Sequence, residues 1–433
     1  MQKFGKFVTK YRNIILVIAL ILLIPSVIGM KATRINYDIL SYLPNDLETI
    51  EGQNILKNDF GTGSFSIILV ENMPTKDIIK LEDKIKKIDN VKAVASAADM
   101  LGTTIPDEAI PEDLRNKIYS GKDTMILVTL KDSMSSDASI ETIEKLRDIT
   151  GTQCKVSGIT AGLLDTRDLS ESEVAIYVII AVILCLIVLQ LALDSYFAPI
   201  LLLSNIGIAI LYNMGTNIFL GEISYITKAI SAVLQLGVTM DFTIFLYHSY
   251  LQEKEKGKNK DEAMANAISS TMTSVLGSAT TTIAGFLALC SMRLTLGRDI
   301  GIVMAKGVLF GLICVITILP ALILAFDKLI EKTRHKPLLP KFKHLRDFNI
   351  KHYKAILVVF VIMIPFAVWG YNHVNVYYNL DSSLPDKLLS VQANKDLKDK
   401  YGIVTTDLLL VDKNMPQYKV EEMLDKINKL DGV

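Results

Sequence analysis

The segment "QLGVTMDFTIFLYHSY", Gln235 to Tyr250, is apolar apart from a carboxylate, Asp241, near its middle. An ionised acid inside a bilayer is unfavourable by several kcal/mol unless a partner or water relieves it. If this segment crosses a membrane, Asp241 has either a functional role or a structural one, in which it pairs with a polar group and holds helices together. We favour the functional role, because intramembrane acids usually have one.

The composition indicates a multispanning membrane protein. The chain has 433 residues, 50% of them hydrophobic, with 46 basic and 46 acidic side chains. The charges crowd into residues 31–173, 251–268, 327–354 and 372–433, and leave bands of about 17 to 25 apolar residues between them. The balanced charge, with no basic patch interleaved with aromatic residues outside the probable cytoplasmic loops, argues against nucleic acid as a partner.

The cysteines predict neither a disulfide framework nor a metal site. Cys185, Cys290 and Cys314 lie within apolar runs, and only Cys154 lies in a polar region. We therefore expect no metal and no cofactor.

Seven apolar runs are predicted to span the membrane, with ends uncertain by several residues. They cover residues 14–30, 174–193, 198–220, 226–250, 269–292, 300–326 and 355–371. The first run has the basic start and apolar core of a signal peptide, but it is long and lacks a clear cleavage site. We therefore favour an uncleaved anchor.

The orientation follows from three basic segments, at 1–13, 254–260 and 328–354. With seven spans all three fall on one side, and Lys and Arg near span ends mark the cytoplasmic side. We expect a multi-pass protein of the cell membrane with a cytoplasmic N-terminus and a basic cytoplasmic linker at 327–354. The segments 31–173 and 372–433 then face outward.

An internal repeat organises the chain. Tyr378 lies 341 residues after Tyr37, and the same shift relates Leu43 and Pro44 to Leu384 and Pro385, and Gly61 to Gly402. With one extra residue, "NMP" at 72–74 meets "NMP" at 414–416, and "DKI" at 83–85 meets "DKI" at 425–427. Each copy begins with a span followed by an outward-facing domain. The second copy is incomplete at Val433, so we expect a longer chain with the rest of that domain and five further spans.

The segment 31–173 is predicted to be an α+β sandwich of the ferredoxin-like type. "GSFSIILVE" and "TMILVTLK" have the composition of strands, and "TKDIIKLEDKIKKID" and "SIETIEKLRDIT" have helical spacing. Gly61 and Gly63 are interpreted as turn residues, because no GxxxxGK pattern opens a helix there.

Asp241 is the candidate proton carrier of the fourth span. Gly237 lies one turn earlier on the same face, where it would admit a neighbouring helix that shields the acid from lipid. Thr280, Thr281 and Thr282 of the fifth span could bond Asp241 or a nearby water, or equally their own helix carbonyls. His248 lies on nearly the same face and could pass protons to the cytoplasm, although an interfacial histidine is more often simply solvated.

Other polar residues in the spans have structural explanations. Lys306 is close enough to the outer end of its span to snorkel to the surface, which we favour over pairing with Asp241. Asn205, Asn213 and Gln235 are interpreted as interhelical hydrogen-bonding groups.

The sequence resembles the resistance-nodulation-division (RND) superfamily. Gly237 to Asp241 matches its GxxxD signature, and "TTTIAGFLAL" at 280–289 is similar to the fifth span of the MmpL-like, hydrophobe exporter branch. The order of one span, a porter domain at 31–173, five spans at 174–326, the linker, a seventh span at 355–371 and a second porter domain from 372 covers the whole chain. The five clustered spans also resemble a sterol-sensing domain.

The resemblance implies proton-driven export of lipids or other hydrophobic molecules, with Asp241 as the proton-relay residue and membrane lipids and protons as partners. The resemblance leaves open whether the protein forms a homo-oligomer. Phe242 departs from the tyrosine that often follows the aspartate, which puts an Asp-Tyr relay in doubt. An alternative is a lipid-sensing or protein-export accessory protein that moves no small molecule. An enzyme has little support, since no Ser-His-Asp order, HExxH or P-loop is found.

Overall fold

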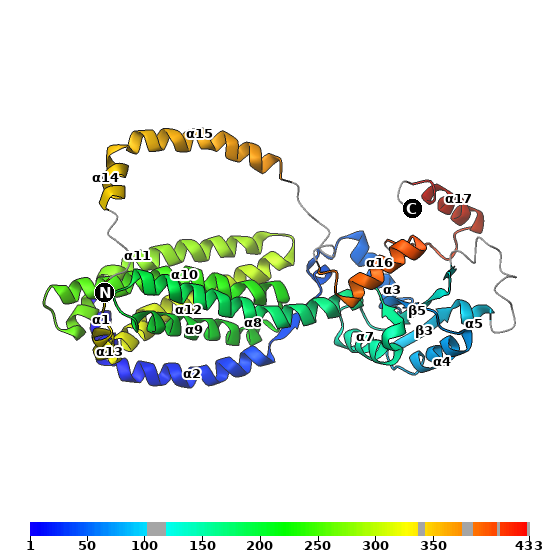
Figure 1. Cartoon of the computed structure of the whole chain (residues 1–433), viewed down its shortest axis with the longest axis horizontal. Helices are drawn as coiled ribbons and strands as arrows, with labels where there is room; N and C mark the ends of the chain where they lie inside the picture. The colour runs from blue at the N-terminus through cyan, green and yellow to red at the C-terminus, as the bar shows by residue number, and fades with distance from the viewer. Residues whose placement is uncertain (102–117, 337–342, 375–383, 405–407, 431–433) are drawn as a thin grey trace. The chain divides into compact units, whose positions relative to one another are not determined.

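The computed structural model describes residues 1–101, 118–336, 343–374, 384–404 and 408–430. Its contacts divide the chain into a helical unit, residues 1–44 and 166–383, and an α/β unit, residues 45–165 and 384–433 (Figure 1). Seven helices in the described residues are long and apolar enough to cross a membrane. The predicted polytopic α-helical membrane fold is confirmed.

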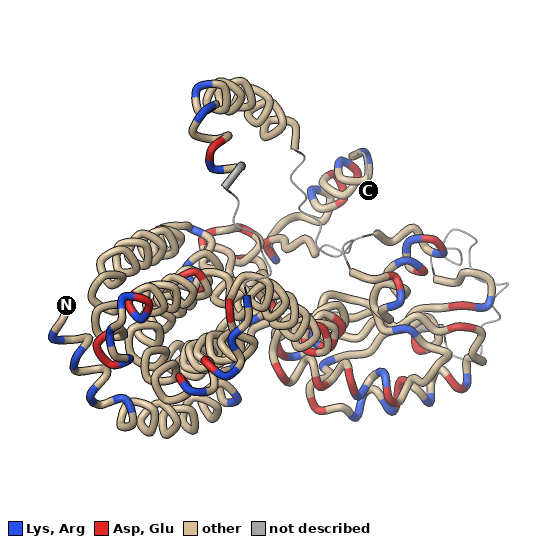
Figure 2. The backbone as a smooth tube through the Cα atoms, turned by 60° about the vertical axis from the view of Figure 1, so that its left-hand side comes forward, with Lys and Arg blue, Asp and Glu red and all other residues tan. Residues whose placement is uncertain are grey.

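The helical unit consists mainly of long helices, and α8 to α12 follow one another with short connections. Its main elements are α1 (Gln2–Lys10), α2 (Arg12–Ala32), α8 (Ile159–Ala192), α9 (Ala198–Gly215), α10 (Tyr225–Glu255), α11 (Lys260–Ala288), α12 (Thr295–Ala325), α13 (Asp327–Lys332), α14 (Lys343–Lys351) and α15 (Tyr353–Asn372). Short 3-10 turns are η1 (Leu40–Tyr42), η4 (Thr216–Leu220) and η5 (Leu289–Ser291). In Figure 2 the charged residues leave long uncharged stretches along these helices.

Helix α12 is the centre of this unit, because it packs against α2, α9, α10 and α11. Glycines on α12 allow close approach: a Cβ at Gly307 would lie 2.7 Å from the Asn213 Nδ2, and one at Gly311 would lie 2.5 Å from the Thr239 Oγ1. No hydrophobic driving force acts between helices in lipid. Small residues let the helix backbones approach closely, and the resulting packing stabilises the association. The core of the unit therefore forms around α12.

Two helices extend well beyond the predicted spans. Helix α8 begins at Ile159 and α11 at Lys260, whereas the apolar runs begin at 174 and 269. Asn259 caps α11 by accepting a hydrogen bond from the Glu262 N–H, and Asp261 and Glu262 lie in its first turn, which suits a helix N-terminus. Polar residues can continue a helix, so the hydropathy of the sequence located only the apolar parts of α8 and α11.

A small parallel pair ties the chain after α2 to the chain before α10. Strand β1 (Arg34–Asn36) pairs with β7 (Glu222–Ser224). The Arg34 and Asn36 side chains both donate to the Glu222 carboxylate, at 3.1 and 3.0 Å. This end of the bundle is thereby closed by backbone and side-chain bonds.

The α/β unit contains one described sheet covered by helices. Its elements are α3 (Glu48–Asn58), β2 (Ser64–Val70), α4 (Thr75–Ile85), β3 (Val91–Ser96), α5 (Ala97–Leu101), β4 (Tyr119–Ser120), β5 (Asp123–Leu130), α7 (Asp137–Thr150), η3 (Gly151–Gln153), β6 (Cys154–Val156), α16 (Leu389–Tyr401) and α17 (Gln417–Ile427). The strands are ordered β3-β5-β2-β6, with β4 beside β5, and every pair is antiparallel. Apart from α5, β4 and η3, the described elements follow the order β2-α4-β3-β5-α7-β6, which is the order of elements named for ferredoxin-like sandwiches.

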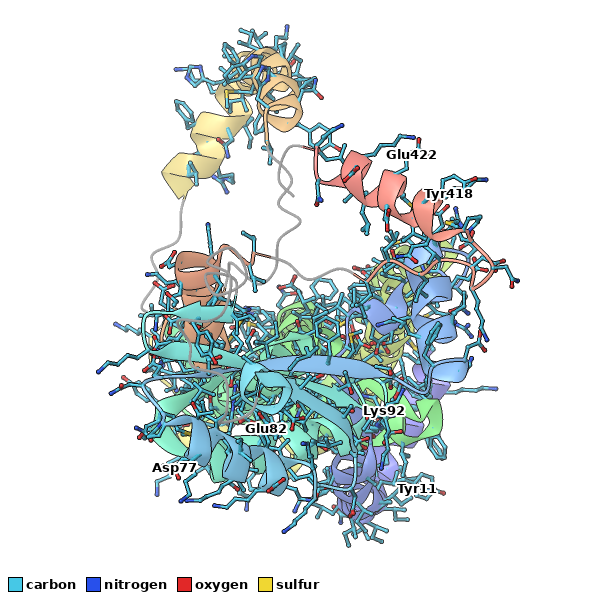
Figure 3. The ribbon with its side chains drawn as sticks, turned by 90° about the vertical axis from the view of Figure 1, so that its right-hand side faces the viewer. Tyr11, Asp77, Glu82, Lys92, Tyr418 and Glu422 are labelled. Carbon is cyan, nitrogen blue, oxygen red and sulfur yellow. The ribbon has the colours of Figure 1, made fainter. Side chains whose placement is uncertain are left out.

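The core of this unit lies between the sheet and helices α4 and α7. Ile68, Val70, Ile126 and Val128 are buried there. In Figure 3 Asp77 and Glu82 are labelled on α4, and Tyr418 and Glu422 on α17. Glu82 is 1% exposed and accepts a hydrogen bond from the Ser96 hydroxyl, and burial raises the pKa of its carboxyl.

Candidate functional site

Helix α10 carries the quoted segment and has two different faces. Ser224 caps it by accepting a hydrogen bond from the Ile226 N–H. The buried face bears mainly hydroxyl, amide and aromatic side chains, namely Thr227, Ser231, Gln235, Leu236, Thr239, Phe242, Thr243, Leu246, Tyr247 and Tyr250. The exposed face bears Val233, Leu234, Gly237, Asp241, Phe245 and His248. The polar core of α10 therefore points into the bundle, and Asp241 points out of it.

Asp241 lies at the middle of α10, 16 residues after Tyr225 and 14 before Glu255. At about 1.5 Å per residue it is over 20 Å from either end of the helix. Its carboxylate is exposed, and among the described residues it makes no hydrogen bond or ion pair. The described part of the helical unit does not satisfy this acid.

Gly237 shares the exposed face of Asp241, but no helix of the described residues approaches it. A Cβ added at Gly237 would meet no atom within 4 Å. The close neighbour expected at this glycine is therefore not found within the described chain.

The three threonines lie on α11, and none of them makes a hydrogen bond to Asp241 in the described structure. The Thr281 and Thr282 hydroxyls donate to the Ser278 carbonyl at 2.8 and 2.9 Å, so these two residues follow the second of the two interpretations, bonding to their own helix. Thr280 and Thr281 are exposed, and Thr282 is half-buried. The hydroxyl of Thr281 or Thr282 would have to leave the Ser278 carbonyl to donate to Asp241.

The exposed face of α11 has a second feature, which the sequence reasoning missed. Thr273, Gly277, Thr281 and Gly285 follow one another at four-residue intervals and are all exposed. Cβ atoms at Gly277 and Gly285 would meet nothing within 4 Å. Small residues at this spacing are the usual signal for a close helix partner in membranes.

His248 lies on the same exposed stripe as Asp241, but its nearest described ring partner is Tyr247, with ring centroids 6.3 Å apart. The neighbouring tyrosines are more firmly held. The Tyr247 hydroxyl donates to Asp194 at 3.3 Å, and the Tyr250 hydroxyl donates to Asp327 at 2.7 Å. These two carboxylates, just after α8 and α12, fix this end of α10, and sequence reasoning had no signal for either pair.

The buried face of α10 is joined to α9 and α12 by a chain of amides. The Asn213 Nδ2 donates to the Gln235 Oε1 at 2.9 Å, and the Gln235 Nε2 donates to the Gly307 carbonyl at 3.0 Å. Asn213 and Gln235 are thus interhelical hydrogen-bonding groups, as predicted. Asn205 is also fully buried, but its amide finds no partner among the described residues.

The prediction for Lys306 was wrong. Its ammonium neither snorkels to the surface nor pairs with Asp241, but donates to the Asn213 carbonyl, the Thr216 hydroxyl and the Asn217 amide at 3.0, 2.9 and 2.6 Å. These acceptors lie where α9 ends, and a helix C-terminus attracts a cation through its unpaired carbonyls. Lys306 therefore fastens α9 to α12.

We expect Lys306→Met to weaken the helical unit without removing proton coupling. The substitution leaves three acceptors without their donor, at about 1 to 3 kcal/mol for a buried unsatisfied group. The unfolding temperature of the purified protein in detergent should fall by several degrees, while Lys332→Met, at the exposed end of α13, should leave it unchanged. Equal unfolding temperatures for both variants would contradict this role.

Phe242, where a tyrosine often stands in the resembled family, is 6% exposed and packs in the core of the bundle. A hydroxyl at this position would face inward, away from the exposed side of α10 that bears Asp241.

The chain matches the sequence profile of the MMPL family over residues 44–338. Among similar proteins, a membrane protein of Methanocaldococcus jannaschii is 25% identical over 368 residues, which is 76% of this chain and 93% of that protein. The siderophore exporter MmpL5 of Mycobacterium tuberculosis is 23% identical over 229 residues, 49% of this chain and 24% of the exporter. The apo-petrobactin exporter of Bacillus anthracis is 24% identical over 290 residues, 63% of this chain and 37% of the exporter.

The match to these two exporters thus spans well under half of their own length. The family match, by contrast, covers more than half of the 433 residues, including α9 to α12 and the segment with Asp241. The RND-type, MmpL-like resemblance is confirmed, and the chain belongs to the MMPL family.

Proposed function

We propose that this protein is a secondary transporter that exports lipids or other hydrophobic or amphipathic molecules across the cytoplasmic membrane while protons enter. Its family membership and two relatives named as exporters support export. The single observation that carries the proton coupling is Asp241, a carboxylate at the middle of a membrane-length helix with no described partner.

Asp241 would act by changing its charge. When protonated it is neutral, and its face of α10 can lie against apolar surroundings. When ionised it requires water or a hydrogen-bond donor, since exposure to lipid is unfavourable by about 3 kcal/mol or more. Each state therefore favours a different arrangement of the exposed faces of α10 and α11, and proton binding can shift the balance between them.

The supporting residues keep the roles expected from the sequence as part of this proposal. Gly237 and the small residues of α11 would admit a helix close to Asp241. Thr280, Thr281 and Thr282 would supply hydroxyls to the acid or to water. His248, seven residues or about 10 Å along α10 from Asp241, would exchange protons with the cytoplasm.

The proposal includes the orientation and the domain layout. The N-terminus (1–13) and the linker (327–354) are cytoplasmic, and the porter domains that guide substrate, 31–173 and from 372, face outward. The clusters of Lys and Arg at 1–13, 254–260 and 328–354 support the assignment of the N-terminus and the linker to the cytoplasmic side.

Inverted membrane vesicles from cells producing the full-length protein test the function. A fluorescent amphipathic probe should accumulate inside during respiration, and a protonophore should abolish the accumulation. Accumulation that survives the protonophore would contradict proton coupling. No accumulation of any probe, together with co-purification of translocation machinery, would favour an accessory role in protein export.

A further inference from the structure

The buried face of α10 carries a row of polar side chains. They follow one another at four-residue intervals, and each is 0% exposed: Thr227, Ser231, Gln235, Thr239, Thr243 and Tyr247. Residues four apart lie above one another on a helix face. The row is about 30 Å long, roughly the thickness of the apolar core of a bilayer. We call this row the polar line.

Each end of the polar line meets a carboxylate. The Thr227 hydroxyl donates to Asp299, near the start of α12, at 2.5 Å. The Tyr247 hydroxyl donates to Asp194, in the connection between α8 and α9, at 3.3 Å. The polar line therefore connects an acid at one end of the bundle with an acid at the other, on the face of α10 opposite Asp241.

Four buried atoms beside the middle of the polar line have no hydrogen-bond partner among the described residues. They are the Asn205 Oδ1 and Nδ2, the Asn213 Oδ1 and the Thr239 Oγ1. Thr239 is a member of the line, and Asn213 is bonded to the line through Gln235.

Asn205 lies at the level of the next member of the line. Helix α9 begins and α10 ends beside α13, so the two helices run in opposite directions. Asn205 is eight residues before Asn213, and Thr243 is eight residues after Gln235. Since Asn213 and Gln235 are bonded, helix geometry places Asn205 near Thr243 along the bundle axis. The four atoms are therefore spread over about 12 Å in the centre of the line.

Water fits this set of atoms better than a cation does. Buried polar groups in proteins are almost always hydrogen-bonded, and ordered water is the partner where the protein supplies none. Three of the four atoms are oxygens, which accept hydrogen bonds, but the Asn205 Nδ2 can only donate. A cation binds oxygens and is repelled by an amide N–H, whereas water both accepts and donates.

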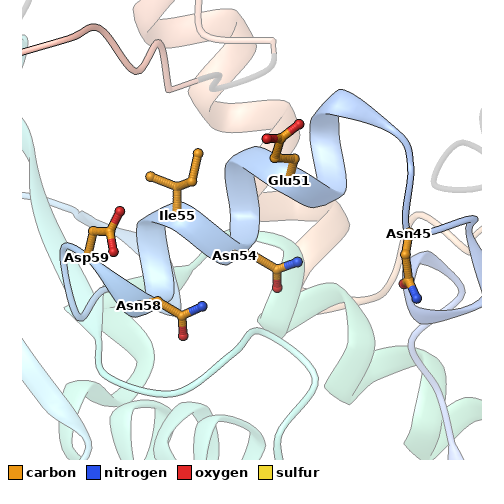
Figure 4. Close-up of a pocket in the computed structure, with 6 residues that line it drawn as sticks. All are labelled: Asn45, Glu51, Asn54, Ile55, Asn58 and Asp59. Carbon is orange, nitrogen blue, oxygen red and sulfur yellow. The ribbon is translucent and has the colours of Figure 1, made fainter.

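Exposed asparagines elsewhere in the chain have no such requirement. In the α/β unit a shallow pocket lies along α3, and Figure 4 shows the residues that line it: Asn45, Glu51, Asn54, Ile55, Asn58 and Asp59. These asparagines are exposed, so bulk solvent satisfies their amides. Asn205 and Asn213 are 0% exposed and need a partner inside the helical unit.

The Lys306 ammonium lies beside the polar line. Its three N–H groups match three acceptors, the Asn213 carbonyl, the Thr216 hydroxyl and the Asn217 amide oxygen. None of these acceptors is a carboxylate, so they stabilise the positive charge without neutralising it. Hydrogen-bonded water molecules pass protons from one to the next, and a fixed positive charge beside them repels a proton in transit.

We propose that bound water completes the polar line at Asn205, Asn213 and Thr239, and that the positive charge of Lys306 blocks the passage of protons along it. The core of the helical unit is then hydrated but does not leak protons. Neither part rests on the proposed transport activity, because the polar line lies on the buried face of α10 and excludes Asp241.

Proton flux through the full-length protein in liposomes tests the barrier, with an imposed pH gradient, valinomycin and K⁺ to remove the membrane potential, and no substrate. Lys306→Gln keeps a hydrogen-bonding side chain but removes the charge, and should raise the protein-dependent flux at least 10-fold. Lys306→Arg keeps the charge and should stay within twofold of the wild type, as should Lys332→Gln at the exposed end of α13. Equal flux in Lys306→Gln and the wild type, with both proteins folded, would overturn the barrier.

Further substitutions test the route of the leak. Asn205→Leu and Thr239→Val remove the water-binding atoms of these two side chains and, added to Lys306→Gln, should return the flux to within twofold of the wild type. Asp241→Asn added to Lys306→Gln should leave the leak unchanged. A leak that persists without the Asn205 and Thr239 polar atoms, or one that requires Asp241, would overturn the route.

Cryo-electron microscopy of the full-length wild type, at a resolution that shows ordered water, tests the water sites without any substitution. Water should lie within about 3.2 Å of the Asn205 amide and the Thr239 hydroxyl. Apolar side chains against both groups, with no water beside either, would overturn the proposal even if Lys306→Gln fails to fold.

Discussion

Asp241→Asn is expected to abolish proton-driven export, by at least 100-fold, while the protein still reaches the membrane in normal amount. Asparagine keeps the size and a hydrogen-bonding group of aspartate but has no proton to gain or lose, so the two charge states that bias α10 no longer exist. The measurement is initial-rate efflux of a substrate from cells carrying equal amounts of each variant. Folding should be preserved, since the Asp241 carboxylate has no described partner to lose.

Two control variants separate the loss of the titratable carboxyl at position 241 from other effects of a substitution in α10. Asp241→Glu keeps a titratable carboxyl and should retain a measurable part of the rate. Glu255→Gln removes a carboxylate from the exposed end of the same helix and should leave export unchanged. Export by Asp241→Asn within twofold of the wild-type rate would remove Asp241 from the mechanism.

Gly215→Ala is expected to disrupt the helical unit, by about 3 kcal/mol or more. A Cβ at Gly215 would lie 2.3 and 2.4 Å from the Ser26 O and Cα, and a Cβ at Gly29 would lie 2.2 Å from the Gly215 O. These are backbone atoms, so no side chain can rotate away and α2 must move off α9. Overpacking of this kind exceeds the gain of about 1 kcal/mol that alanine brings to a helix.

Gly207→Ala is the matched control, because it lies on the same helix and its Cβ would meet nothing within 4 Å. Unfolding of the purified proteins in detergent, followed by tryptophan fluorescence or circular dichroism, should place Gly207→Ala at or above the wild type and Gly215→Ala far below it. The same unfolding temperature for both alanine variants would contradict the close contact between α2 and α9.

The sequence was sufficient for features that depend on local composition. Hydropathy located the seven membrane-length helices of the described residues, and the repeat register related α4 to α17 residue by residue. The spacing of Gly237, Asp241 and His248 also placed them on one stripe of α10, which is exposed in the structure. Regular periodicity is enough for such statements, because it needs no knowledge of neighbouring helices.

Features that depend on tertiary neighbours could not be predicted. Lys306 is held by the end of α9, ninety residues earlier in the chain. Leu69 of β2 packs against α16, more than 300 residues later. Thr281 and Thr282 had two equally good partners in the sequence, and only the geometry of α11 selected the Ser278 carbonyl.

The most direct test of the central claim is proton entry coupled to substrate movement. Purified full-length protein in proteoliposomes, with a pH-sensitive dye inside and an imposed substrate gradient, should move protons against the direction of the substrate. The wild type should show a substrate-dependent pH change that Asp241→Asn lacks at equal protein density. An equal pH change in both proteins would contradict the claim that Asp241 carries the proton.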